Sequence, residues 1–357
     1  MKVKNRIFNN ILDIKDKFDM FIFDMYGVLW NGKEIYQNVP ETLQALKREG
    51  KIVYILSNAT QLAFEFKKSY AKHGLTKGVH YDNAITSGEV ARDFLLNKGL
   101  KFQNNTKPRK FYTVGIKNKS LFENTIYNEV DKPEEADFFY VGVPQLTEEQ
   151  IKFLPSELKD KVFLSKIKDN GEKQYSITQL DIFKEELLKM KELKLPAFNA
   201  NPDIGALKND ISNNSTRYGL AQGAIAEYYK NIGGEVLEIG KPYRQVYNYI
   251  FNQLQSRGIK INKNRIAMVG DTVRTDICGA NQVGIQAVLT VGTGISAEKV
   301  VKNGKVDFAS LDKICFNENG YANYLIQSVM GKQIDIYQPL KSCIQNKYLS
   351  EVCKRWK

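Results

Sequence analysis

Short runs of hydrophobic residues alternate with amphipathic helical stretches along most of this chain. Runs such as Ile52–Leu56 and Ile266–Val269 are continuously apolar, which is typical of strands buried on both faces of a parallel sheet. Stretches such as 40–49 and 243–255 lie between these runs and repeat their apolar positions at helical spacing. The alternation predicts an α/β fold, a Rossmann-like doubly wound parallel sheet covered by helices. Its candidate strands are Phe18–Phe23, Lys51–Leu56, Asn83–Thr86, Glu235–Ile239, Arg265–Val269 and Gln286–Thr290.

A second set of strand-like runs occupies the middle of the chain. The segment Lys168–Glu172 between two of these runs contains Asn170 followed by Gly171, a dipeptide that strongly indicates a tight β-hairpin. A helical stretch over Gln179–Glu192 follows. These features predict a separate α/β domain inserted into the first one. Its candidate strands are Lys110–Val114, Ala136–Val141, Val162–Ile167 and Gln174–Ile177.

The length of 357 residues exceeds that of a typical single domain, so two domains are expected. We predict a discontinuous core domain over 1–88 and 204–330, with the inserted domain over 89–203. The final segment, 331–357, is weakly patterned and is predicted to be a C-terminal extension, either a helical appendage or a partly disordered tail. A hydrophobic content of 43% is sufficient for buried cores.

The net charge of +12 comes mainly from lysines that are spread along the chain. A diffuse positive field attracts phosphorylated small molecules, nucleic acids and acidic membranes alike, so it identifies none of them. Tyr and Phe number 19 each, and such aromatics among lysines can bind single-stranded RNA by stacking. Most of them fall within apolar runs such as Phe138–Tyr140, where core packing is favoured. A nucleic-acid partner is therefore not expected.

The sequence also lacks the features of secreted and membrane proteins. No run approaches the 18 apolar residues of a membrane span, and the N-terminal segment has no apolar signal-peptide core. The four cysteines do not have the close spacing of a metal or disulfide framework. The only two histidines, His73 and His80, are expected to face solvent rather than share a metal ion. These features predict a cytoplasmic protein without membrane association.

The strongest chemical signal is the apolar run Phe21–Phe23, which ends in Asp24 and turns at Gly27. Carboxylates at the carboxyl ends of parallel strands point into the crevice where such sheets bind ligands. Asp24 taken alone could merely cap a turn. The other strand ends decide between these two interpretations.

Three further strand ends carry polar groups. Ser57 and Asn58 follow the second strand, Lys241 follows the fourth, and Asp271 follows the fifth, with Asp276 five residues on. Because the strand ends of one parallel sheet share an edge, these groups are expected to cluster. Three carboxylates would repel one another without a cation, and hard oxygen ligands favour Mg²⁺. A lysine and a hydroxyl beside them would suit a phosphate dianion.

The four segments, in this order, resemble the four motifs of the haloacid dehalogenase (HAD) superfamily of aspartate-nucleophile phosphotransferases. The motifs lie at Phe21–Trp30, Ile55–Asn58, Glu238–Pro242 and Ile266–Ile277. Gly-Val-Leu-Trp in the first and Gly-Asp-x-x-x-Thr-Asp-Ile in the last resemble class IIA, the branch of nitrophenylphosphatase-like and nucleotide or sugar phosphatases. In that branch an α/β cap is inserted into the HAD core between the second and third motifs, where the inserted domain is predicted here.

The resemblance implies a role for each matching residue. Asp24 would attack phosphorus and form an aspartyl-phosphate that water then hydrolyses. Ser57 and Lys241 would hold the phosphoryl oxygens and offset their developing charge. The expected ligands of Mg²⁺ are Asp24, Asp271, Asp276, the last directly or through water, and the main-chain carbonyl of Tyr26.

Residues beyond the phosphoryl site are expected to select the substrate. A cap that closes over the sheet edge would supply these contacts and exclude water. Asn58 is predicted to bind the substrate, and Asp203, near the return from the inserted domain, is predicted to line the pocket. The expected substrate is a small phosphorylated metabolite whose identity the sequence leaves open. A homodimer formed through the cap is one candidate assembly.

One position departs from the pattern of the phosphatases in this superfamily. They carry a second aspartate, which acts as general acid and base, two residues after the nucleophile, whereas this chain has Tyr26. With an ordinary pKa near 10, a tyrosine can donate a proton but is a poor base at neutral pH. General acid–base catalysis contributes about 10²–10⁴-fold, so slow hydrolysis is expected.

Three functions therefore stay open at this stage. The first is a phosphatase for esters whose leaving group needs little protonation, with Tyr26 as a weak acid. The second is a phosphotransferase or a long-lived phosphoenzyme. The third is a non-catalytic protein that binds a phosphorylated ligand and acts in regulation. Dehalogenation is disfavoured because it does not need Mg²⁺, yet Asp271 and Asp276 are both present.

Overall fold

The computed structural model describes residues 7–260 and 262–331, which form two compact units. Of the described residues, unit 1 comprises those within Met1–Leu56, Ser69–Ala84 and Gln253–Lys357. Unit 2 comprises Ser57–Lys68 and Ile85–Asn252. The predicted C-terminal extension lies, apart from its first residue, outside the described residues.

Unit 1 is built on a seven-stranded sheet with the order β1-β19-β16-β15-β2-β3-β4. Its central strands β2 and β15 run parallel, with Phe21 opposite Ala267, and are buried on both faces. Parallel strands covered on both faces need continuously apolar sequences, which is the pattern that predicted them. The strands are β1 (Ile7–Phe8), β2 (Met20–Phe23), β3 (Ile52–Ser57), β4 (Asn83–Thr86), β15 (Ile266–Gly270), β16 (Gln286–Thr290) and β19 (Tyr324–Ile326).

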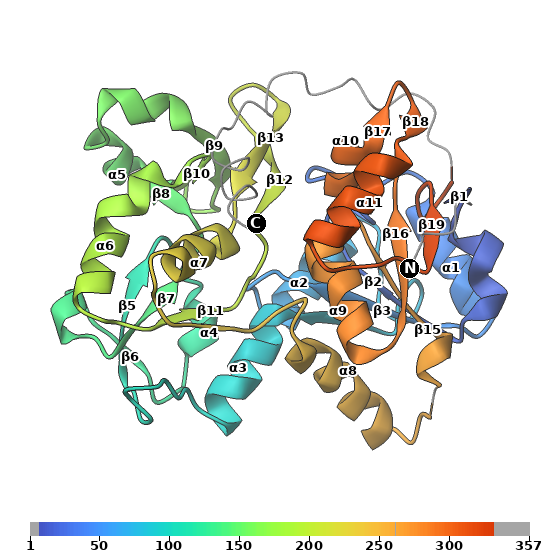
Figure 1. Ribbon diagram of the computed structural model, residues 1–357, viewed down its shortest axis with the longest axis horizontal. Coiled ribbons are helices and arrows are strands. Elements are labelled where there is room, and N and C mark those ends of the chain that lie inside the picture. The colour runs from blue at the N-terminus through green and yellow to red at the C-terminus, as the bar shows by residue number, and fades with distance from the viewer. Residues whose placement is uncertain (1–6, 261, 332–357) are drawn as a thin grey trace. The chain divides into compact units, whose positions relative to one another are not determined.

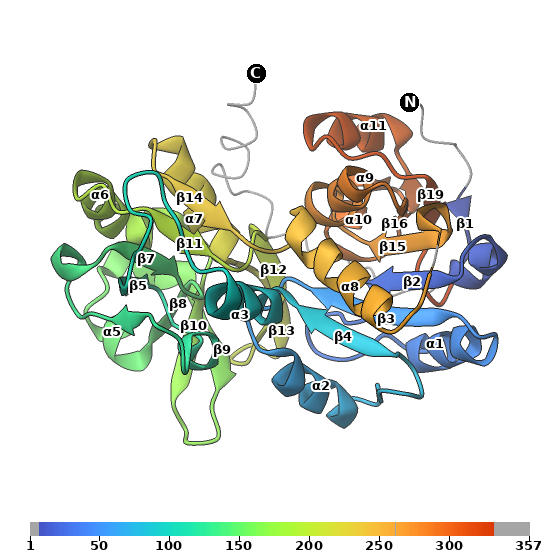
Figure 2. The same cartoon turned by 90° about the horizontal axis from the view of Figure 1, so that it is seen from below.

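Helices cover this sheet on both sides, as the alternating pattern predicts. In Figure 2, α9, α10 and α11 lie on one side of the sheet and α1 on the other. The amphipathic α1 has Pro40 in its first turn and buries Val39, Leu43 and Leu46. The helices of unit 1 are η1 (Ile11–Lys17), α1 (Val39–Arg48), η5 (Lys263–Arg265), the π-helix η6 (Val273–Ile277), α9 (Cys278–Val283), α10 (Gly294–Val300) and α11 (Phe308–Asn317). Strands β17 (Val301–Lys302) and β18 (Lys305–Val306) form a small hairpin. The helices α2 (Ala63–Lys72) and α8 (Arg244–Ser256) each begin in unit 2 and end in unit 1.

Unit 2 contains a five-stranded sheet, a three-stranded antiparallel sheet and a two-stranded hairpin (Figure 1). The five-stranded sheet has the order β14-β11-β7-β5-β6, and its strands pair in parallel. Its strands are β5 (Lys110–Val114), β6 (Asn128–Glu129), β7 (Phe138–Val141), β11 (Ala197–Asn199) and β14 (Val236–Glu238). The antiparallel strands are β8 (Gln145–Thr147), β9 (Val162–Ile167) and β10 (Lys173–Ile177), and the hairpin consists of β12 (Gly205–Asp210) and β13 (Ser215–Leu220).

The helices of unit 2 pack on these sheets around a shared apolar core. Phe139, Leu187 and Ile225 bring β7, α6 and α7 into that core, and all three are fully buried. The fold is therefore α/β, with a parallel core sheet and a separate inserted region, as predicted. The helices are α3 (Ser87–Asn97), α4 (Lys119–Phe122), η2 (Pro133–Glu135), α5 (Glu148–Lys152), η3 (Ser156–Lys161), η4 (Leu180–Phe183), α6 (Lys184–Glu192) and α7 (Gln222–Asn231).

The structure confirms the predicted Asn-Gly hairpin. Strands β9 and β10 pair antiparallel, and the Gly171 N–H donates to the carbonyl of Lys168 within the turn. Gly171 has φ +82°, a left-handed conformation that glycine adopts without strain.

Among the helices of the described residues, none is long and apolar enough to cross a bilayer.

One predicted strand belongs to a different sheet. The run 235–239 is expected in the core sheet, but β14 pairs in parallel with β11, with Ala197 opposite Val236. A buried apolar run has the same appearance in either parallel sheet, and its partner strand β11 is too short to stand out in the sequence. This pairing is one reason why residues 204–252 fall in unit 2, whereas the predicted limits of the inserted domain, 89–203, stay a prediction.

Candidate active site

Asp24 directly follows β2 and lies at the carboxyl edge of the parallel sheet of unit 1. Its N–H donates to the carbonyl of Val269 on the neighbouring β15 (2.8 Å), so strand pairing fixes its backbone. The chain then turns sharply, because the Met25 carbonyl accepts the N–H groups of Leu29 and Trp30 (both 2.9 Å). Asp24 is buried, with 8% of its surface exposed.

Two further carboxylates meet Asp24 at this edge. Asp271 follows β15, and Asp276 lies in η6, one turn later. All three are buried, and each offers a carboxylate oxygen within 4.8 Å of the others. The structure thus brings together the three aspartates that the sequence predicts.

Hydrogen bonds hold two of these carboxylates in place. Asp271 accepts the Ile295 N–H on Oδ2 (2.6 Å) and the Thr272 hydroxyl on Oδ1 (3.1 Å). Asp276 Oδ2 accepts the Thr272 N–H (3.1 Å). Neutral donors of this kind orient the carboxylates without cancelling their charge.

The remaining negative charge calls for a cation. At a separation of 4.8 Å, two carboxylates repel by about 3 kcal/mol even with an effective dielectric constant of 20. Three buried anionic oxygen donors fit a hard divalent cation, since Mg²⁺ and Ca²⁺ take oxygen ligands. The donor set therefore fits a hard divalent cation, the class of metal that the sequence predicts.

Two glycines make room for Asp271. A Cβ at Gly294 would lie 2.0 Å from Asp271 Oδ2, and a Cβ at Gly27 would lie 2.4 Å from the same atom. Both glycines have positive φ, +76° and +79°. The sequence shows Gly292-Thr-Gly294 only as a turn; its contact with Asp271 depends on the pairing of β15 and β16 and has no separate sequence signal.

Tyr26 stands where the acid/base aspartate is expected from the resemblance. The residue is 43% exposed, yet the protein packed around it raises the pKa of its phenol, and the charge of Asp24 raises that pKa further. Burial also raises the pKa of Tyr70, on α2, well above its ordinary value, with Tyr26 and Asp24 contributing. Both phenols therefore stay protonated at neutral pH. Sequence reasoning missed Tyr70, which falls in an ordinary helical pattern.

The remaining predicted site residues lie in unit 2. Ser57 is the last residue of β3 and is 2% exposed, and its Oγ accepts the Ala59 N–H (3.2 Å). Lys241 follows β14 and is 1% exposed. A buried cationic side chain at the end of a strand is consistent with an anion-binding role.

The Asn58 side chain clamps the main chain of Lys241. Its Oδ1 accepts the Lys241 N–H (2.7 Å), and its Nδ2 donates to the Lys241 carbonyl (3.1 Å) and to Asp203 Oδ1 (2.9 Å). Asn58 is 2% exposed. These contacts join Asn58 to two other residues predicted to bind substrate. Lys241 is 183 positions from Asn58 in the sequence, and Asp203 is 145 positions from it.

A second buried network supports the strand that leads to Lys241. Glu238, the last residue of β14, accepts hydrogen bonds from Asn199 Nδ2 (2.9 Å) and from the Tyr243 hydroxyl, and pairs with Lys230 (2.5 Å). The sequence gives no signal for this network, because its members come from β11, α7, β14 and the segment before α8 and meet only in the folded chain.

The two histidines do not share a site. The His73 ring packs edge-on against Trp30, with ring centroids 4.6 Å apart, and is exposed. His80 Nδ1 accepts the N–H of Thr76 (2.9 Å). Cys278 and Cys315 are free thiols and buried.

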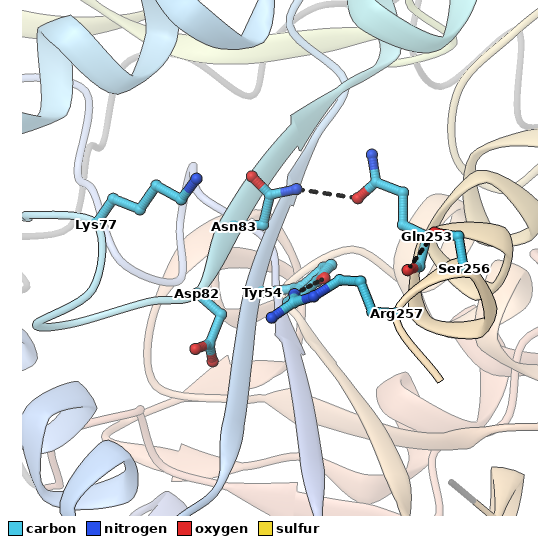
Figure 3. Close-up of a pocket in the computed structure, with 7 residues that line it drawn as sticks. All are labelled: Tyr54, Lys77, Asp82, Asn83, Gln253, Ser256 and Arg257. Atoms are coloured by element: carbon cyan, nitrogen blue, oxygen red, sulfur yellow. Dashed lines mark hydrogen bonds between the residues drawn. The ribbon is translucent and has the colours of Figure 1, made fainter. Parts of the chain in front are cut away.

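A separate cavity of about 360 Å³ in unit 1 contains none of the predicted site residues. Figure 3 shows Arg257 beside Tyr54 and Asn83 facing Gln253, joined by hydrogen bonds of 3.2 and 3.0 Å. Asn83 begins β4, whereas the aspartates follow the carboxyl ends of β2 and β15. This open, polar hollow is not the candidate active site. It is lined by Tyr54, Lys77, Asp82, Asn83, Gln253, Ser256 and Arg257.

Comparison with protein families agrees with this geometry. A family model described as haloacid dehalogenase-like hydrolase matches residues 21–118, and a second, HAD-hydrolase-like, matches residues 238–312. Together the two matches contain the three aspartates, Ser57 and Lys241. The chain is therefore similar to haloacid dehalogenase-like hydrolases in both segments that carry the candidate site.

Relatives and solved structures extend the comparison over most of the chain. Phosphoglycolate phosphatase 1A, chloroplastic, of Arabidopsis thaliana is 23% identical over 296 residues, covering 81% of this chain and 72% of the relative. The 4-nitrophenylphosphatase of Schizosaccharomyces pombe is 25% identical over 296 residues, covering 80% and 87%. These relatives are phosphatases of small phosphate esters.

Among solved structures, a haloacid dehalogenase-like hydrolase from Brucella suis has a TM-score of 0.65 at 22% identity, covering 90% of this chain and 99% of that one. A 4-nitrophenylphosphatase from Thermotoga maritima has a TM-score of 0.55 at 20% identity, covering 89% and 97%. At these identities the structures establish a shared fold, which is α/β with a parallel core sheet and a separate inserted region.

Proposed function

We propose that this protein is a Mg²⁺-dependent phosphatase of small phosphorylated metabolites that works through an aspartyl-phosphate on Asp24. The observation that carries the proposal is the cluster of three buried aspartates. We take Asp24 as the nucleophile because it directly follows the strand of the first motif, which resembles the nucleophile motif of the HAD superfamily. The phosphate esters in the relatives' names, phosphoglycolate and 4-nitrophenyl phosphate, suggest the class of substrate.

The cation would be held by Asp24, Asp271, Asp276 and the main-chain carbonyl of Tyr26. When bound, it would neutralise the carboxylates and the phosphoryl oxygens, so that an anionic nucleophile can approach an anionic ester. An oxygen of Asp24 then attacks phosphorus, the bond from phosphorus to the ester oxygen breaks, and the leaving oxygen takes up a proton. Water subsequently attacks the aspartyl-phosphate, which releases inorganic phosphate and restores the Asp24 carboxylate.

In this proposal Lys241 and Ser57 bind the phosphoryl group. The lysine ammonium offsets the negative charge of the phosphoryl oxygens, and the hydroxyl donates to one of them. Asn58 and Asp203 act by orienting Lys241, since the Asn58 amide holds both main-chain polar groups of Lys241. The hydrogen bonds of Asn58 to Lys241 and Asp203 therefore support a rigid phosphate-binding loop.

Tyr26 sets the expected rate. A phenol whose pKa is raised can donate a proton to the leaving oxygen but cannot remove one from water at neutral pH. Dephosphorylation of Asp24 by water then limits kcat, while esters with good leaving groups have the higher kcat/KM because their phosphoryl transfer to Asp24 needs little protonation.

The test is Mg²⁺-dependent release of 4-nitrophenol from 4-nitrophenyl phosphate, with Asp24→Asn as the matched control. We expect slow turnover that is lost in the control. A labile phosphoprotein that accumulates on Asp24 without turnover would select a phosphoenzyme or phosphotransferase instead. Binding of Mg²⁺ and phosphate without phosphorylation of Asp24 would select a non-catalytic ligand-binding protein.

A further inference from the structure

The β12–β13 hairpin of unit 2 carries a lysine whose charge no carboxylate balances in the described part of the chain. Lys208, on β12, lies opposite Arg217 on β13. Arg217 is compensated, because its guanidinium lies 3.3 Å from the buried Asp210 and 4.7 Å from the centre of the Phe163 ring. The Lys208 ammonium instead donates to the main-chain carbonyl of Leu220 (2.9 Å).

A glycine fixes the direction of the Lys208 side chain. Side chains two apart on a strand share a face, so Lys208, Arg217 and Gly219 lie on one face of the hairpin. A Cβ at Gly219 would lie 3.0 Å from Lys208 Cδ and 3.4 Å from Nζ. The absence of a side chain at position 219 thus lets the lysine lie along the hairpin and place its ammonium at the hairpin base.

The base of the hairpin is joined to the predicted phosphate-binding residues. Leu220 pairs with Gly205, which is only two residues, or about 7 Å, from Asp203. The Gly223 N–H donates to the Asp203 carbonyl (2.9 Å), and Asp203 Oδ1 accepts the amide of Asn58. Asn58 in turn holds Lys241. A chain of contacts within unit 2 therefore runs from the ammonium of Lys208 to the backbone of Lys241.

The environment of Lys208 disfavours its charge. Burial lowers the pKa of Lys208 to about 8, and no opposing carboxylate contributes. Lys208 is half-buried, and its ammonium has three donors. A partly desolvated cation is stabilised when an anion and further acceptors complete its contacts. An anionic ligand would supply both.

We propose that Lys208 binds a second anionic group of the substrate, a carboxylate or a second phosphate on the molecule whose phosphoryl group Lys241 holds. The proposal rests on the proposed function for the identity of the first group. It makes Lys208 a specificity residue, so phosphate esters with an anionic tail bind better than esters without one.

The test compares Lys208→Met, Lys208→Arg and wild type on three esters. The esters are 2-phosphoglycolate, with a carboxylate tail; fructose 1,6-bisphosphate, with a phosphate tail; and 4-nitrophenyl phosphate, with no second anion. We expect Lys208→Met to raise KM about tenfold or more for at least one ester with an anionic tail, and less than about twofold for 4-nitrophenyl phosphate. Lys208→Arg, which keeps the charge, should retain most of the preference. Which tail is affected distinguishes the two sources of the anion.

Binding to the Asp24→Asn protein, measured by calorimetry with Mg²⁺ present, separates this inference from the proposed function. One outcome is that esters with an anionic tail bind, that Lys208→Met weakens their binding selectively, and that wild type hydrolyses none of the esters. That result would support the anion-binding role of Lys208 and refute the phosphatase function. Equal effects of Lys208→Met on all three esters, no effect on any, or no binding of tailed esters would each overturn the inference. Lys189→Met, which removes an exposed lysine of α6, controls for the change in net charge.

Discussion

Gly294 provides a sharp test of how tightly the aspartate cluster is built. Gly294→Ala would place a Cβ 2.0 Å from Asp271 Oδ2 and 2.4 Å from Asp271 Cβ. An ordinary contact is about 3.4 Å or longer, so Asp271 would have to move by roughly 1.4 Å. The left-handed backbone at φ +76° adds a cost of about 1–2 kcal/mol for any residue with a Cβ.

The structure supplies a control that carries the backbone cost alone. Gly304 has φ +73°, and a Cβ there meets nothing within 4 Å. Gly304→Ala should therefore lose about 1–2 kcal/mol of unfolding free energy and bind Mg²⁺ like wild type. Gly294→Ala should lose more stability and, because Asp271 is displaced, bind Mg²⁺ about 10–100-fold more weakly.

The assays are urea unfolding with and without Mg²⁺ and calorimetric titration with Mg²⁺. A Gly294→Ala protein that binds Mg²⁺ as tightly as the Gly304→Ala protein would refute this prediction. It would show that displacing Asp271 does not weaken Mg²⁺ binding, so that Asp271 is not a metal ligand. Equal losses of stability in the two variants would show that Asp271 yields without cost.

Three further predictions follow from individual contacts. Asn58→Leu removes two hydrogen bonds to the Lys241 backbone and one to the Asp203 side chain, so it should lower the unfolding free energy by about 3 kcal/mol and reduce kcat/KM. Unchanged kcat/KM in steady-state assays would argue against a positioning role for Asn58. Lys208→Met should raise the unfolding free energy at pH 7, because folding lowers the pKa of Lys208 from 10.5 to about 8 and so disfavours its charged form. The difference in unfolding free energy between variant and wild type should shrink between pH 8 and 10.5, where Lys208 loses its charge in the folded state before the unfolded state. A difference in urea unfolding that does not change with pH would contradict the lowered pKa. Tyr26→Asp should raise turnover of alkyl phosphates by about 10²-fold, and a variant with no gain would show that more than the acid/base group is missing.

Much of unit 1 could be predicted from the sequence because its information is local. The strands Asn83–Thr86 and Gln286–Thr290 match the predicted bounds, since continuous apolar runs between turn residues have few alternative structures. The gathering of Asp24, Asp271 and Asp276 follows from the rule that carboxyl ends of parallel strands share an edge.

The rest depends on tertiary contacts that leave no local pattern. β11 is only three residues long, so neither it nor its pairing with β14 could be predicted. The Asn58 clamp joins residues that are 183 positions apart, and its purpose appears only when Lys241 is in place. The direction of Lys208 depends on a glycine in the opposite strand, which a single sequence cannot connect with it.

The central claim is that three aspartates share one divalent cation, and Asp276→Asn tests it most directly. The asparagine can still accept the Thr272 N–H, so the change removes a charge and little else. In EDTA, urea unfolding should show Asp276→Asn to be more stable than wild type by a few kcal/mol, because repulsion of about 3 kcal/mol per carboxylate pair is relieved. In saturating Mg²⁺ the same variant should be less stable than wild type, because it binds the cation more weakly. The same order of stability in both solutions would contradict a shared metal site.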